Sequence, residues 1–117
     1  DIISLHVPLN ETTKGLINSE KLLLMKESAI LINTARGPVV DSAALAEALN
    51  SGKIAGAGVD VFEVEPPIPV DHVLFGAKNL LVTPHVAFAT AEAFEKRAVI
   101  VFDNIEKWLK GTPQNVM

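Results

Sequence analysis

Four polar side chains, Arg36, Asp60, Glu65 and His85, lie at or just beyond the ends of short apolar runs. A guanidinium can bind a carboxylate bidentately and polarise a neighbouring carbonyl. An imidazole can take up and return a hydroxyl proton near neutral pH, and a carboxylate on its second ring nitrogen orients it and favours its charged form. We therefore interpret Arg36, Glu65 and His85 as a catalytic set, and Asp60 as an acceptor for an amide-bearing ligand.

Each of these residues also has an ordinary structural explanation. Taken alone, a loop arginine pairs with a surface carboxylate about as often as it binds a substrate, and a lone histidine is more often structural than catalytic. Spacing alone leaves Glu63 open beside Glu65 as the histidine's partner. We interpret His6 as a residue that shapes a loop and His72 as a surface residue of a proline-rich segment.

The apolar runs alternate with helical patterns, which is typical of β–α–β units in a parallel sheet covered by helices on both faces. Ligands of such sheets bind beyond the carboxyl ends of the strands, where the four polar residues fall. Three N-caps are expected: Asn18 or Ser19, Asp41 and Thr90. Predicted strands span 2–7, 29–33, 54–62 and 80–83, and predicted helices span 18–27, 42–51 and 91–110.

Composition excludes several classes of function. The 117 residues suit one domain, or half of a large one, and we treat residues 1–117 as a single domain. The net charge of −4 does not favour nucleic acid or anionic membranes, and no apolar run approaches the roughly 20 residues of a membrane span. The absence of cysteine excludes disulfides and thiolate ligands, and no metal motif is present. We therefore expect a cytoplasmic protein with no metal, nucleic acid or membrane partner.

The chain begins at Asp1, directly in an apolar run that reads as a buried strand. We interpret it as a piece of a longer protein, truncated in the N-terminal half of the sheet. No glycine-rich phosphate loop is present, so we expect the piece alone to be inactive. An uncovered first strand and an apolar last helix predict self-association, most simply as a two-fold homodimer. We expect this association to be a product of the truncation and not the native interface of the longer protein.

Four segments occur in order and together resemble the D-isomer-specific 2-hydroxyacid dehydrogenases: LHVPLNETTKGLI, ILINTARGPVVD, AGAGVDVFEVEP and LLVTPHVAFATAEA. The resemblance covers the whole chain and matches the second half of that family's NAD-binding domain together with its tail. It implies a partial Rossmann-like fold, NAD as cofactor with NADP not excluded, and hydride transfer between a D-2-hydroxy acid and its 2-keto acid. It also admits an alternative of the same fold, a nicotinamide-sensing corepressor, which turnover of 2-keto acids would distinguish.

The resemblance also implies residue roles. The family's catalytic residues fall on Arg36, His85 and Glu65, because Glu65 directly precedes proline as the family's glutamate does. Phe88 is more similar to the D-lactate-type members than to the phosphoglycerate or glyoxylate types. Asp60 takes the role of binding the nicotinamide carboxamide. The remaining cofactor contacts fall on Val7, Pro8, Thr13, Thr34 and Ala35, with Arg36 and His85 contributing to both sets.

Overall fold

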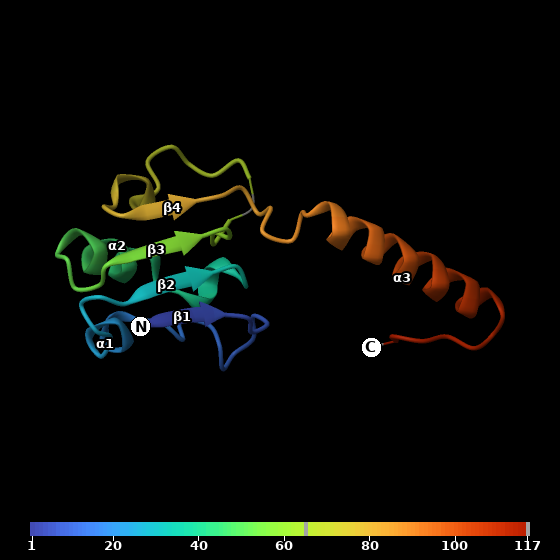
Figure 1. The fold of residues 1–117 in the computed structure, drawn as a ribbon. Coiled ribbons are helices and arrows are strands. Elements are labelled where there is room, and N and C mark those ends of the chain that lie inside the picture. The colour runs from blue at the N-terminus through green and yellow to red at the C-terminus, as the bar shows by residue number, and fades with distance from the viewer. Residues whose placement is uncertain (65, 117) are drawn as a thin grey trace. The chain divides into compact units, whose positions relative to one another are not determined.

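The computed structural model of the chain describes residues 1–64 and 66–116. It contains two compact units, Asp1–Val86 and Ala87–Met117, each described here by itself. The first unit holds the strands and short helices, and the second holds one long helix with its flanking segments (Figure 1).

The first unit is built on a parallel sheet of four strands in the order β1-β2-β3-β4 (Figure 1). In register, Leu5 lies opposite Asn33, Asn33 opposite Val59, and Val59 opposite Val82. All four strands therefore end at the same level, and the loops that follow them share one edge of the sheet. The strands are β1 (Ile2–Leu5), β2 (Ile30–Asn33), β3 (Gly56–Val59) and β4 (Leu80–Val82).

The helices that connect the strands are α1 (Ser19–Leu23), α2 (Ser42–Asn50) and the short 3-10 helix η2 (Val73–Gly76). Two predicted N-caps are confirmed: the Asn18 side chain accepts from the Lys21 N–H, and the Asp41 side chain accepts from the Ala44 N–H. Several elements are shorter than predicted. In α1 the last N–H groups bond three residues back, which tightens and ends the helix before residue 27.

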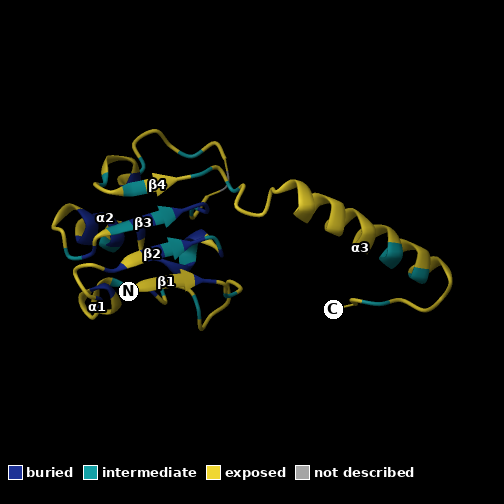
Figure 2. Cartoon of the chain, viewed as in Figure 1, coloured by how far each residue is buried: buried dark blue, intermediate teal, exposed yellow. Residues whose placement is uncertain are grey.

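The core lies on one face of the sheet. Leu5, Leu31 and Val59 point to this face and are buried in the core with residues of α1 and α2. Figure 2 colours the chain by burial, with buried residues in dark blue. Ile30 and Leu81 point to the opposite face and remain 38% and 70% exposed. Successive right-handed crossovers that step along a sheet in one direction place their helices on one face. The predicted parallel α/β sheet is confirmed, whereas the described residues of the first unit cover only one of its two faces.

The second unit contains α3 (Ala91–Leu109), which begins after the predicted N-cap, Thr90, whose hydroxyl accepts from the Ala93 N–H. Gln114 folds back and donates to Asn104 at 2.9 Å, which fastens the tail to the helix. Within the described residues, no helix is both long and apolar enough to cross a membrane. The apolar stripe of α3 is exposed throughout: Phe94, Val101, Phe102, Ile105, Trp108 and Leu109.

We expect the 117-residue chain on its own to self-associate. Ile2 and Ile3 of β1 are 69% and 36% exposed beside an unpaired strand edge, and Trp108 of α3 is 69% exposed. Exposed strand edges and apolar patches of this kind favour association with a second copy. Sedimentation at tens of micromolar tests this, and a stable 12.5 kDa monomer would contradict it.

Candidate active site at the carboxyl edge of the sheet

The loop after β2 is shaped by Asn33, whose side chain is buried. Its Nδ2 donates to the Arg36 carbonyl at 3.0 Å, and its Oδ1 accepts from the Ala35 N–H at 3.1 Å. These bonds fold residues 34–36 into a tight turn and leave Arg36 exposed, with an Nη1 hydrogen bond to the Ala35 carbonyl at 2.6 Å. Sequence reasoning missed Asn33. The available signal was a polar residue on the buried face at the end of an apolar strand.

Gly37 brings the Arg36 loop against the segment that follows β3. A Cβ atom at residue 37 would lie 1.9 Å from the Phe62 carbonyl carbon and 2.4 Å from the Glu63 backbone nitrogen. Only glycine permits this approach of two backbones. The loop that carries Arg36 and the segment that leads toward Glu65 are therefore in direct contact.

Replacing Gly37 with alanine is expected to destabilise the fold by about 1–3 kcal/mol or more, because one of these two backbone segments must move. It should also lower any activity that needs both segments in place. Urea unfolding of the full-length protein that carries this sequence measures the change. Gly76→Ala is the matched control, because a Cβ there meets no atom within 4 Å. Equal stability of the two variants would contradict the close packing at Gly37.

Asp60 fixes the turn that carries His85. The Asp60 side chain is buried, and its Oδ1 accepts from the Thr83 hydroxyl at 2.5 Å and from the Val86 N–H at 2.8 Å. The Asp60 carbonyl accepts from the His85 N–H at 2.9 Å. His85 has a φ of 57°, a left-handed conformation that non-glycine residues seldom adopt. The three hydrogen bonds to Asp60 stabilise this backbone conformation and so fix the position of the His85 Cα, from which the imidazole side chain extends.

The loop after β1 closes on itself through Asn10 and Thr13. The Asn10 side chain accepts from the backbone N–H groups of Thr12 and Thr13, and the Thr13 hydroxyl donates to the Pro8 carbonyl at 2.6 Å. Val7 and Pro8 closely follow the last strand residue, so they lie at the same edge as the other predicted site residues. His6 contacts the Ser4 hydroxyl through Nε2 at 2.7 Å.

Glu63, one of the two carboxylates left open by spacing, is committed to structural partners. Its Oε2 lies 3.2 Å from His72 Nε2. Burial raises the pKa of Glu63, but hydrogen bonds from the Ser42 side chain, its own backbone N–H and His72 outweigh it and hold the pKa below 4.5. A lowered folded-state pKa stabilises the fold above pH 4.5, and this stabilisation is lost as the pH falls through the folded value. Glu65 lies outside the described residues.

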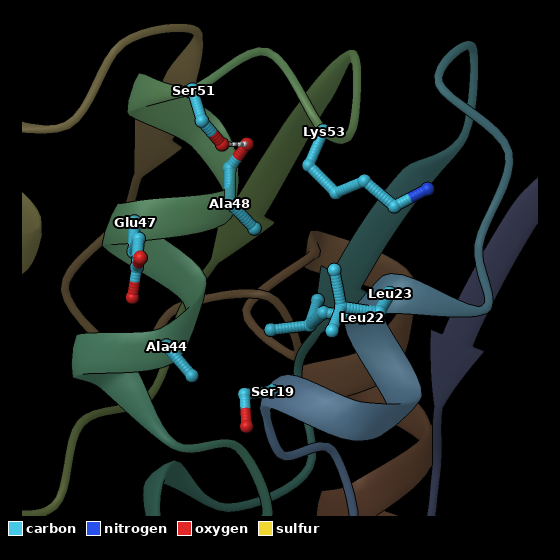
Figure 3. A pocket seen from close by; sticks show the side chains of 8 residues that line it. All are labelled: Ser19, Leu22, Leu23, Ala44, Glu47, Ala48, Ser51 and Lys53. Carbon is cyan, nitrogen blue, oxygen red and sulfur yellow. Dashed lines mark hydrogen bonds between the residues drawn. The ribbon is translucent and has the colours of Figure 1, made fainter.

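The structure thus places the predicted residues 7–8, 34–36, 60 and 85 on loops that follow four adjacent strands. A small hollow beside Asp60 and His85 is lined further by Val61, Phe62, Val64, Pro66, Ile68 and Pro84. Another pocket lies between α1 and α2, where Leu22, Ala48 and Lys53 line it (Figure 3). It contains none of the predicted site residues. The edge that follows the strands is therefore the candidate site.

Comparison with known proteins then decides the family. The family model described as "D-isomer specific 2-hydroxyacid dehydrogenase, NAD binding domain" matches residues 1–87. The chain belongs to this dehydrogenase family. Among curated relatives of these dehydrogenases, the glycerate dehydrogenase of Methylorubrum extorquens is 53% identical over all of this chain and 38% of its own length. The glyoxylate reductase of Thermofilum pendens is 52% identical over 95% of this chain and 32% of its own length.

Solved dehydrogenase structures agree. A D-lactate dehydrogenase with NAD+ from Lactobacillus jensenii superposes with a TM-score of 0.86 at 37% identity, covering all of this chain and 39% of that one. An acyclic imino acid reductase in complex with NADPH and D-Arg gives a TM-score of 0.87 at 39% identity, covering all of this chain and 37% of that one. The chain thus spans less than two-fifths of the length of these dehydrogenases and reductases.

The described residues fit the nicotinamide half of a dinucleotide. The buried Asp60 carboxylate supplies an acceptor at the strand ends, and the tight turn at residues 34–36 lies at the same edge. Both groups lie beyond the carboxyl ends of the strands, which is where doubly wound sheets bind cofactors. The family model of an NAD-binding domain assigns a nicotinamide cofactor, and an acceptor such as Asp60 at this edge is consistent with it.

Proposed function

We propose that the full-length protein carrying this chain interconverts 2-keto acids and D-2-hydroxy acids with NAD or NADP. The observation that carries this proposal is the placement of the Arg36 loop, Asp60 and the His85 turn on adjacent strand ends of one sheet edge. A guanidinium, a buried carboxylate and an imidazole on one edge supply anion binding, amide binding and proton transfer together.

Each catalytic side chain has one task in this proposal. Arg36 binds the substrate carboxylate and polarises the C2 oxygen, for which its exposure and forked donors suit it. His85 gives a proton to the C2 oxygen in reduction and removes it in oxidation. Glu65 orients the imidazole and favours its charged form. The nicotinamide, when bound, supplies or accepts the hydride.

The chain's own cofactor contacts follow from the same edge. Asp60 accepts a hydrogen bond from the nicotinamide carboxamide while its bonds to Thr83 and Val86 keep the His85 turn in place. Val7, Pro8 and Thr13 contact the cofactor from the loop after β1, and Thr34 and Ala35 contact it from the loop after β2. Val7 and Pro8 lie just after β1, and the Thr13 hydroxyl is bonded to the Pro8 carbonyl. Thr34 and Ala35 lie just after β2, and the Ala35 N–H is bonded to Asn33, the last residue of that strand.

Small keto acids are the substrates we propose, with hydroxypyruvate and glyoxylate first. Relatives named glycerate dehydrogenase, hydroxypyruvate reductase and glyoxylate reductase are 53%, 44% and 52% identical to this chain. Solved structures named D-lactate dehydrogenase are 36–37% identical. The expectation from Phe88 of a D-lactate-type substrate stays a prediction, and pyruvate belongs in the same comparison.

We further propose a cytoplasmic homodimer, because nicotinamide cofactors and keto acids meet in the cytoplasm and because two-fold dimers are the commonest oligomers of soluble proteins. A steady-state assay tests the function. The full-length protein, with NADH or NADPH, is supplied with hydroxypyruvate, glyoxylate and pyruvate in turn. We expect saturable oxidation of one reduced cofactor with at least one acid. A folded protein that binds NADH yet turns over none of them would contradict the proposal and favour a cofactor-sensing module.

A further inference from the structure

We propose that Glu63 and His72 form a clamp that positions Glu65 for its task on His85. The inference rests on the function proposed above, since it assigns positioning residues to that reaction. The clamp is the side-chain contact between Glu63 Oε2 and His72 Nε2 at 3.2 Å, which closes a chain segment of nine residue steps. Glu65 stands within that segment, two residues after Glu63.

The segment between the two anchors cannot be held by a regular backbone ladder. Pro66, Pro67 and Pro69 have no N–H to donate. Val70 is 95% exposed and supplies little packing, whereas Val64, Pro66 and Ile68 line the small hollow beside Asp60 and His85. A carboxylate in such a segment needs anchors at the ends of the segment if it is to keep a fixed distance to a neighbouring imidazole.

At the first anchor, the Glu63 side chain is bonded to the start of α2. Its carboxylate accepts from the side chain of Ser42, the first residue of α2. Directly before it, the Phe62 carbonyl packs on Gly37 of the Arg36 loop. The anchor therefore sets the start of the segment relative to Arg36 as well as to α2.

At the second anchor, His72 is held on both sides of its ring. Its Nδ1 accepts from the Leu74 N–H at 3.3 Å, so Nε2 is the nitrogen that donates to Glu63. Phe62 packs edge-on at 5.2 Å between ring centroids, and Phe75 packs at 5.7 Å. Leu74 is 2% exposed and ties this end of the segment to the core. The interpretation of His72 as a surface residue is wrong, because the side chain is 14% exposed.

The clamp consists of hydrogen bonds, which distinguishes it from a charge effect. A glutamine at residue 63 keeps one oxygen that can accept from His72 Nε2, whereas an alanine keeps nothing. Glu63→Gln should therefore preserve the clamp and Glu63→Ala should remove it. His72→Phe keeps the aromatic packing but loses both ring nitrogens, so it removes the clamp from the other end.

Steady-state kinetics on the full-length protein test the clamp. We expect Glu63→Ala and His72→Phe each to lower kcat for keto-acid reduction about tenfold while the KM values for keto acid and cofactor change less than about twofold. Glu63→Gln should retain kcat within about twofold. Val70→Ala, in the same segment and almost fully exposed, is the matched control and should match the wild type. Wild-type kcat in both clamp variants would overturn the proposal.

A second comparison asks whether the clamp acts through Glu65. In a Glu65→Gln background, Glu63→Ala should cost less than about twofold in kcat, because the carboxylate that the clamp positions is already gone. An undiminished tenfold loss in that background would show a general structural role and overturn the inference. Failure of the proposed function is distinguishable, since the wild-type protein itself would then show no turnover. Circular dichroism identifies a variant that has lost its fold, and the other clamp variant then decides.

Discussion

Replacing His85 with asparagine in the full-length protein is expected to lower kcat for keto-acid reduction by about 10²–10⁴-fold, the range contributed by a positioned general acid. Asparagine tolerates a positive φ better than most residues, so it can keep the backbone conformation at φ 57° and the N–H bond to the Asp60 carbonyl. The loss should therefore report the missing proton donor rather than a rearranged turn.

Stopped-flow or steady-state measurement of nicotinamide absorbance gives kcat and KM for this variant. The KM for the cofactor should change little, since His85 acts on the substrate oxygen. His6→Asn is the control, because His6 is exposed and contacts only Ser4 among the hydrogen bonds found for its ring in the described residues. A His85→Asn protein with kcat within about threefold of the wild type would mean that another group moves the proton.

Arg36→Lys is expected to lower kcat/KM roughly 30- to 1000-fold. This corresponds to a loss of about 2–4 kcal/mol of transition-state stabilisation. Lysine keeps the charge but presents one compact head, so it cannot bind a carboxylate through two parallel bonds and polarise the C2 oxygen as well. Arg36 is exposed, and its side chain donates to the adjacent Ala35 carbonyl, a bond within its own loop. The substitution should therefore leave the fold intact.

The comparison with Lys26→Arg separates this effect from a general change in basic residues, because Lys26 is an exposed residue paired with Asp1. Both variants are measured with the keto acid that the wild type prefers. If the Arg36→Lys variant kept nearly wild-type kcat/KM, Arg36 would be a loop residue without contact to the substrate.

The placement of the candidate residues at one sheet edge could be predicted from the sequence because parallel sheets obey simple geometry. Apolar runs alternating with helical patterns predict strands whose carboxyl ends share one edge, and Arg36, Asp60 and His85 follow such runs. The caps at Asn18, Asp41 and Thr90 could be predicted because a short polar side chain before a helix satisfies orphan N–H groups.

The contacts between loops could not be predicted in this way. Two examples are the packing of Gly37 on the Phe62 carbonyl and the pairing of Glu63 with His72. Each contact depends on how two irregular segments meet, and irregular segments have no periodic sequence pattern from which the contact could be predicted. The uncovered sheet face was also unexpected. The alternation of apolar runs with helical patterns predicts helices between the strands, but it does not predict on which face of the sheet each connecting helix lies. The family resemblance distinguished Glu65 from Glu63, and the commitment of Glu63 to Ser42 and His72 supports that choice.

Isotope transfer is the measurement that tests the proposed reaction most directly. The full-length protein is supplied with hydroxypyruvate and reduced nicotinamide carrying deuterium at both C4 positions, and the product is analysed by NMR and chiral chromatography. We predict D-glycerate with deuterium at C2. The His85→Asn protein should form this labelled product about 10²–10⁴-fold more slowly than the wild type. Oxidation of the cofactor without deuterium at C2, or formation of the L-isomer, would contradict the assignment of this edge as a D-2-hydroxyacid dehydrogenase site.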